Sequence, residues 1–185
     1  MREELRKVTI GKLDTVHGSI GIVEYDATWP ILFEREAVRI RSALGKQALQ
    51  VEHVGSTSVP GLAAKPKIDI LLVLLDTADE PACVPLLEAA GYVLRIREPD
   101  WHEHRMFKGP DTDINLHCFS EGCPEIRRML TFRNWLRSDE GDRAMYERTK
   151  RELAARTWRY VQDYADAKTS IVEEILATAD EHVQR

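Results

Sequence analysis

Cysteine is scarce in this 185-residue sequence, and its spacing excludes two common kinds of stabilisation. Cys83, Cys118 and Cys123 are odd in number and widely separated, which argues against a disulfide framework. Their spacing also fits no standard zinc-ligand pattern. If residues 113–119 form a strand, His117 and Cys118 point to opposite faces and cannot bind one ion.

The sequence also lacks a basic excess and any long apolar run. It has 26 Lys and Arg against 31 Asp and Glu, with a net charge of -5. An acidic chain of this kind is not expected to bind nucleic acid. We find no segment long and apolar enough to cross a membrane, and Met1–Leu5 does not start a signal peptide. We therefore expect a cytoplasmic protein without a membrane partner.

Hydrophobic periodicity predicts an α/β (α+β) fold in a single domain, residues 1–185. A mixed sheet with flanking helices is expected over residues 1–120, and a helical tail packed on it over 121–185. Expected strands cover residues 48–54, 67–75, 92–96, 104–108 and 113–119, with residues 20–25 as a further strand or an irregular lead-in. Expected helices cover residues 28–44, 81–90, 124–137, 139–155 and 157–181.

The segment between the first two central strands carries the clearest chemical signal. Gly55 allows close approach to the backbone because it has no Cβ, and Ser56 and Thr57 offer hydroxyl and N–H donors. Lys65 adds a cation, and Asp69 is a ligand for Mg²⁺ bridging to a phosphate. These residues predict a phosphate site; the alternative is a capped turn in which Asp69 is merely hydrogen-bonded.

The same segment, HVGSTSVPGLAAKP over residues 53–66 followed by Ile68-Asp69-Ile70, resembles the signature of the GrpB family. Further matches follow in the family's order: Tyr25-Asp26 with Trp29, Gly91-Tyr92, Leu116-His117, Phe132-Arg133 with Leu136-Arg137, Tyr146 with Lys150, and Tyr164 with Ala167-Lys168. The resemblance implies a nucleotidyltransferase-like fold. It also implies a relationship to domains fused to dephospho-CoA kinase.

That superfamily typically places two carboxylates two residues apart on one strand, where both bind the divalent ions. Here Leu71 stands where the second carboxylate belongs, so Asp69 is left without its usual partner. Asn115 and His117 share a face of a later strand but bring no negative charge. If the missing carboxylate limits metal binding, Leu71→Asp should strengthen Mg²⁺-dependent nucleotide binding.

Two histidines complete the expected site. His53 and His117 match family positions and are candidate catalytic residues beside Asp69, since histidine can act as a base or bind phosphate near neutral pH. Each is alternatively a hydrogen-bonded structural histidine. The cluster His102-Glu103-His104 is expected in a solvated loop.

Cations from the helical tail are expected to form one wall of the cleft. Tyr146 and Lys150 lie one helical turn apart, as do Tyr164 and Lys168. Arg133 and Arg105 are the further candidates for phosphate binding, although each cation alone also fits an ordinary surface position.

Two functions remain open from the sequence. The first is a protein that binds a nucleotide or another phosphorylated small molecule, with nucleotidyl transfer as its leading chemistry. The second is a non-catalytic binding protein that kept the cleft and lost the metal centre.

Overall fold

The protein is described by a computed structural model that covers residues 2–13, 15 and 20–183. Its centre is a mixed sheet in the order β1-β2-β5-β4-β3. The central pair, β2 and β5, is parallel, and the other neighbouring strands are antiparallel. The strands are β1 (Gln50–Val54), β2 (Ile68–Leu74), β3 (Val93–Glu98), β4 (His104–Lys108) and β5 (Ile114–Ser120).

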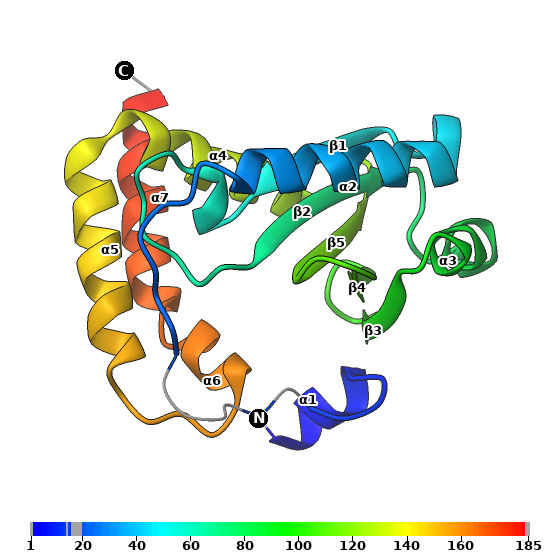
Figure 1. Ribbon diagram of the computed structural model, residues 1–185, viewed down its shortest axis with the longest axis horizontal. Coiled ribbons are helices and arrows are strands. Elements are labelled where there is room, and N and C mark those ends of the chain that lie inside the picture. The colour runs from blue at the N-terminus through cyan, green and yellow to red at the C-terminus, as the bar shows by residue number, and fades with distance from the viewer. Residues whose placement is uncertain (1, 14, 16–19, 184–185) are drawn as a thin grey trace.

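One face of the sheet is covered by α2 (Trp29–Leu44) and α3 (Glu80–Ala89), as Figure 1 shows. The predicted stripe of α2 is buried, from Phe33 to Leu44. It packs on side chains such as Ile70 and Leu72 of β2. The alternate residues of β2, Leu71 and Val73, are buried on the other face. The continuous apolar run of this strand therefore fits burial on both faces, as predicted.

The second face is covered by α4 (Pro124–Ser138), and α5 (Glu140–Ala154) and α7 (Thr169–Val183) stand beside it (Figure 1). The single helix expected over residues 157–181 is wrong. A capping box between Tyr160 and Asp163 starts the short helix α6 (Val161–Asp166), which ends before α7 begins. The break places Lys168 at a helix junction.

Two further differences lie in the N-terminal part. The helix α1 (Arg2–Val8) is absent from the sequence prediction, and residue Thr9 behind it pairs with Ile96 of β3. In place of a strand over residues 20–25, the structure has a single bridge between Val23 and Ala64. Among the described residues, no helix combines the length and apolar character needed to span a membrane.

Candidate functional site

The turn after β1 is shaped around Gly55. Its φ of +68° lies in the left-handed region, and a Cβ at this position would lie 2.6 Å from Asp69 Oδ2. Glycine is therefore required both by the backbone conformation and by the close approach of the carboxylate. The Ser58 hydroxyl donates to Gly55 O at 2.6 Å and closes the turn, which continues as the 3₁₀ helix η2 (Ser56–Ser58).

Asp69 lies on β2 beside this turn and is held by two neighbours from β5. Asn115 Nδ2 donates to Asp69 Oδ1 at 2.8 Å, and His117 Nε2 lies 3.9 Å from the same oxygen. Burial raises the pKa of Asp69, but His117 and the Asn115 hydrogen bond outweigh it, so that the pKa lies below its usual value. The side chain keeps 30% of its exposure, so an ionised carboxylate reaches solvent.

His117 begins a chain of hydrogen bonds across the sheet. Its Nδ1 lies 3.1 Å from His104 Nε2, and His104 Nδ1 lies 2.6 Å from Glu98 Oε2. The expectation that His104 lies in a solvated loop is wrong: the residue starts β4 and is 4% exposed. Asp69, His117, His104 and Glu98 thus connect the middle of the sheet to its β3 edge.

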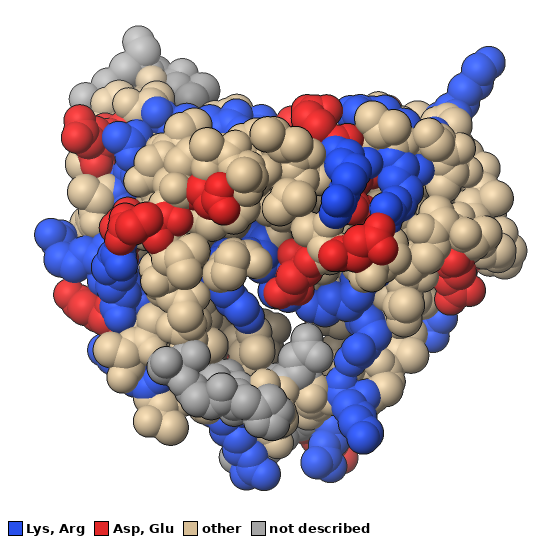
Figure 2. All heavy atoms as spheres, in the orientation of Figure 1, with Lys and Arg blue, Asp and Glu red and all other residues tan. Residues whose placement is uncertain are grey.

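A cavity of about 410 Å³ opens over these residues, between the sheet and the helices α1, α5 and α6. We call it the cationic cavity because six of its described lining residues are Lys or Arg, whereas Asp69 is the one acid among them. Those cations are Lys65, Lys67, Arg95, Lys108, Lys150 and Lys168. Figure 2 shows a hollow in the middle of the face in view, with Lys and Arg atoms and one group of Asp or Glu atoms at its rim.

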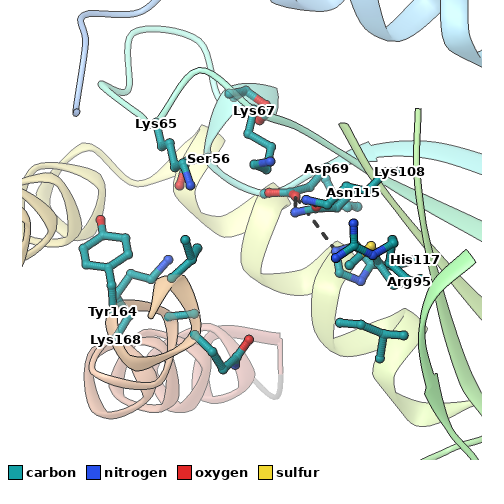
Figure 3. A pocket seen from close by; sticks show the side chains of 18 of the residues that line it. Ser56, Lys65, Lys67, Asp69, Arg95, Lys108, Asn115, His117, Tyr164 and Lys168 are labelled. Atoms are coloured by element: carbon teal, nitrogen blue, oxygen red, sulfur yellow. Dashed lines mark hydrogen bonds and ion pairs between the residues drawn. The ribbon is translucent and has the colours of Figure 1, made fainter. Parts of the chain in front are cut away.

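The two walls of the cationic cavity face each other in Figure 3. Asp69, Asn115 and His117 lie on the sheet side, and Tyr164 and Lys168 project from the helical side. Gly55, Ser56, Thr57 and Lys65 complete the lining, so the structure brings most of the predicted phosphate-binding residues to one place.

Lys150 is the most deeply buried of these cations, at 2% exposure. Its Nζ donates to Ala63 O at 2.5 Å and lies 4.8 Å from the centre of the Tyr146 ring. Burial, helped by the charge of Lys168, lowers the pKa of Lys150 to about 7. Tyr146 is itself buried; burial raises its pKa to about 12 against a hydrogen bond with Ser56.

Lys168 repeats the arrangement, with Nζ 4.8 Å from the centre of the Tyr164 ring. The two Tyr-to-Lys spacings in the sequence thus both place a lysine on an aromatic ring at the cavity wall.

Besides Tyr146, three predicted site residues lie outside the lining of the cationic cavity. Arg105 is 5% exposed and donates from Nε to Glu80 Oε1 at 2.6 Å, on the α3 side of the sheet. Arg133 donates from Nη1 to Glu52 Oε2 at 2.7 Å and to His53 O at 2.9 Å, joining α4 to β1. Both guanidinium groups are engaged in holding elements together.

His53 is the third. It pairs in register with Ile70 and therefore faces away from Asp69, with its ring stacked 4.9 Å from Phe33. Its Nε2 lies 3.0 Å from Thr57 Oγ1, which donates in turn to Lys67 O at 3.1 Å. Burial lowers the pKa of His53 to about 4, so it is a neutral residue of the core at physiological pH. Its contacts support the turn from below.

Sequence reasoning missed Lys67, Arg95 and Lys108 as cavity residues. Lys67 forms an ion pair with Asp113. Lys108 Nζ donates to Asn115 Oδ1 at 2.7 Å, and Arg95 Nη2 donates to Lys12 O at 2.5 Å. Lys108 could have been placed only from the pairing of β4 with β5, in which it lies directly opposite Asn115. The sequence alone does not say which strands are neighbours.

The donors present do not fit a Mg²⁺ ion held by the protein. Mg²⁺ requires an octahedral shell of oxygens, usually with one or two carboxylates and phosphate or water. Asp69 Oδ1 is already engaged by Asn115, and Leu71 is fully buried beneath α4. Over the part of the chain that the structure describes, no group of three His, Cys, Asp or Glu side chains could hold a metal ion.

A family model described as GrpB protein matches residues 19–178. The chain belongs to the GrpB family. It is 66% identical over 178 residues to the UPF0157 protein BH1888 of Halalkalibacterium halodurans, covering 96% of this chain and 91% of that protein. The crystal structure of the conserved protein GrpB from Enterococcus faecalis superposes with a TM-score of 0.78 at 31% identity, over 89% of this chain and 100% of that one.

A dephospho-CoA kinase of Mycolicibacterium paratuberculosis is 30% identical over 175 residues, which cover 80% of this chain and 43% of that protein. The predicted family is therefore confirmed. The predicted mixed sheet with flanking helices and a helical extension is confirmed with it, and its nucleotidyltransferase-like character stays a prediction.

Proposed function

We propose that this GrpB-family protein binds a phosphorylated small molecule, with the phosphate groups in the cationic cavity. The observation that carries the proposal is the local reversal of charge. Six cations and one carboxylate line the cavity in a chain whose net charge is -5. A cavity with low-dielectric walls and charges of one sign concentrates an oppositely charged ligand.

Each wall has a distinct part in this binding. Lys65 and Lys168 provide point charges, and the Ser56 hydroxyl, hydrogen-bonded with Tyr146, lies beside Lys65 (Figure 3). Asp69 repels a phosphate that comes too close to β2, while Asn115 and His117 offer hydrogen-bond donors at the same place. The arrangement favours an extended ligand with several phosphate oxygens over a single small anion.

Nucleotidyl transfer is the second candidate function. It is favoured by the chain from His117 through His104 to Glu98, which gives a proton taken up at the cavity wall a path to a second carboxylate. Against it stands Leu71, which leaves the site with one acid. A divalent ion would then have to enter already bound to the nucleotide. We therefore place phosphate binding first.

Calorimetric titration tests the proposal. We would titrate ATP, dephospho-CoA and inorganic tripolyphosphate, each with and without Mg²⁺, the second ligand being suggested by the name of the kinase relative. We expect binding of at least one of them without Mg²⁺, and we expect Lys168→Met to weaken it about tenfold, as the loss of one charge contact would.

Lys46→Met is the matched control, since Lys46 is an exposed cation in η1 (Gly45–Gln47) and does not line the cationic cavity. It should leave the affinity unchanged. Failure of all three ligands to bind at millimolar concentration, or equal effects of the two substitutions, would contradict the proposal.

A further inference from the structure

A second cavity of about 490 Å³ adjoins the cationic cavity. The two share six lining residues, so they are compartments of one continuous site: Leu5, Leu13, Ile96, His117, Met129 and Gln162. His117 therefore stands at the junction. A ligand whose phosphates occupy the first compartment can extend past His117 into the second.

The walls of the second compartment are aromatic. The rings of His104 and Phe119 are stacked with their centres 4.8 Å apart, and Trp101 stands edge-on to both, at 5.3 and 5.8 Å. We call it the aromatic cavity. Trp101 lines the cavity and is 44% exposed. A large aromatic ring that is left this open to solvent can bury further apolar area when a ligand packs on it.

The backbone that presents Trp101 is unfavourable. His102 and Glu103 follow it with φ of 55° and 50°, and both are in the left-handed region that residues other than glycine rarely adopt. Backbone strain of this kind persists where the surrounding structure fixes it, and it is concentrated at ligand sites. Here the turn sets the ring of Trp101 against the edge of the sheet.

The charge of the aromatic cavity is opposite to that of its neighbour. Among the described residues, no Lys or Arg lines it, whereas Glu98, Asp163 and Asp166 do. Glu98 is engaged by His104, and Asp163 accepts from the Tyr160 N–H at 3.2 Å as the cap of α6. Asp166 is exposed and accepts from Gln162 Nε2 at 2.7 Å, through Oδ1. Its second oxygen is the one best placed to accept from a ligand.

We propose that the aromatic cavity binds the amino-substituted base of a nucleotide whose phosphates lie in the cationic cavity. The inference rests on the proposed function and narrows it to one ligand class. A planar base stacks with Trp101, its exocyclic amine donates to Asp166, and the phosphates reach the lysines past His117. A carbonyl at the same position of the base would meet a carboxylate and be rejected.

The test compares ATP, ITP and tripolyphosphate, because ATP and ITP differ at the 6-position of the purine, amine against carbonyl. We expect the wild type to bind ATP more tightly than ITP. Trp101→Ala should weaken ATP about tenfold and leave tripolyphosphate unchanged, since stacking acts on the base alone. Trp101→Phe should restore most of the loss, and melting temperatures of both variants check the fold.

Asp166→Asn should abolish the preference for ATP over ITP, whereas the matched change Asp180→Asn, at an exposed position of α7, should not. This inference would be overturned, with phosphate binding left intact, if the protein bound ATP no more tightly than tripolyphosphate. The same holds if Trp101→Ala weakened the binding of ATP and of tripolyphosphate equally. Failure of tripolyphosphate, both nucleotides and dephospho-CoA to bind would overturn both this inference and the proposed phosphate binding.

Discussion

Lys150 is expected to favour phosphate binding while it lowers the stability of the folded protein. It is 2% exposed, and burial together with Lys168 lowers its pKa from 10.5 to about 7. Between these two values the unfolded chain holds a proton that the folded protein releases. Folding therefore loses stability as the pH falls from about 10.5 to 7, and the loss is complete below 7.

The size of the effect follows from the displacement of the pKa. At about 1.4 kcal/mol per unit, the penalty at pH 7 is about 4 kcal/mol. Lys150→Met removes it but leaves Ala63 O without its donor, which costs about 1–3 kcal/mol. The variant should thus be more stable than the wild type at pH 7 by about 2 kcal/mol, or about 4–8 °C in melting temperature.

Ligand binding should change in the opposite direction. A phosphate in the cavity favours the charged form of Lys150, so binding at pH 7 should take up about half a proton and weaken as the pH rises above 7. Titrations in buffers of different ionisation enthalpy measure this uptake. In Lys150→Met the uptake from this residue should vanish, and affinity should fall.

Lys168→Met provides the control, because it removes the charge that helps lower the pKa of Lys150. The midpoint of the pH dependence should then move to higher pH while the uptake persists. A Lys150→Met protein that is less stable than the wild type at pH 7, with proton uptake unchanged, would refute this reasoning.

Three further substitutions follow from the same geometry. Gly55→Ala should destabilise by about 1–2 kcal/mol from its left-handed φ, and more from the clash with Asp69, and should weaken phosphate binding; unchanged melting and titration curves would contradict this. His53 has a pKa lowered to about 4, so its contribution to stability is present above pH 6.5 and declines by about 3 kcal/mol as the pH falls to 4. The difference in free energy of unfolding between wild type and His53→Gln, measured by urea denaturation, should accordingly narrow towards pH 4. A difference that stays constant with pH would contradict the stabilising role of neutral His53. Leu71→Asp should destabilise by several kcal/mol without gaining Mg²⁺ affinity, because it buries an unpaired carboxylate under α4, whereas Leu71→Asn should cost less; enhanced Mg²⁺-dependent binding would restore the metal site expected from the sequence.

The elements of the fold were largely predictable because their signals are local. The buried stripe of α2 and the apolar run of β2 follow from periodicity alone. The break between α6 and α7 was missed because the residues across it continue a helical pattern, and only the cap at Tyr160 and Asp163 separates them. The sequence also gave no signal for α1.

The site was predictable where one strand or one helical turn sets the direction of a side chain. Alternation placed Asp69 and Leu71 on one face of β2 and His117 opposite Leu116 and Cys118, and the structure agrees. Arg105 and Arg133 could not be placed, because their partners Glu80 and Glu52 lie far away in sequence. His104 was missed because its burial depends on how β3, β5 and the turn at Trp101 meet around it.

The most direct test of phosphate binding in the cationic cavity is a crystal structure of the protein grown with tripolyphosphate. The account predicts phosphate density between Ser56 and Lys168, within hydrogen-bond distance of Lys65 and away from Asp69 Oδ2. Density outside the cavity, or a cavity that holds only water at saturating tripolyphosphate, would contradict it.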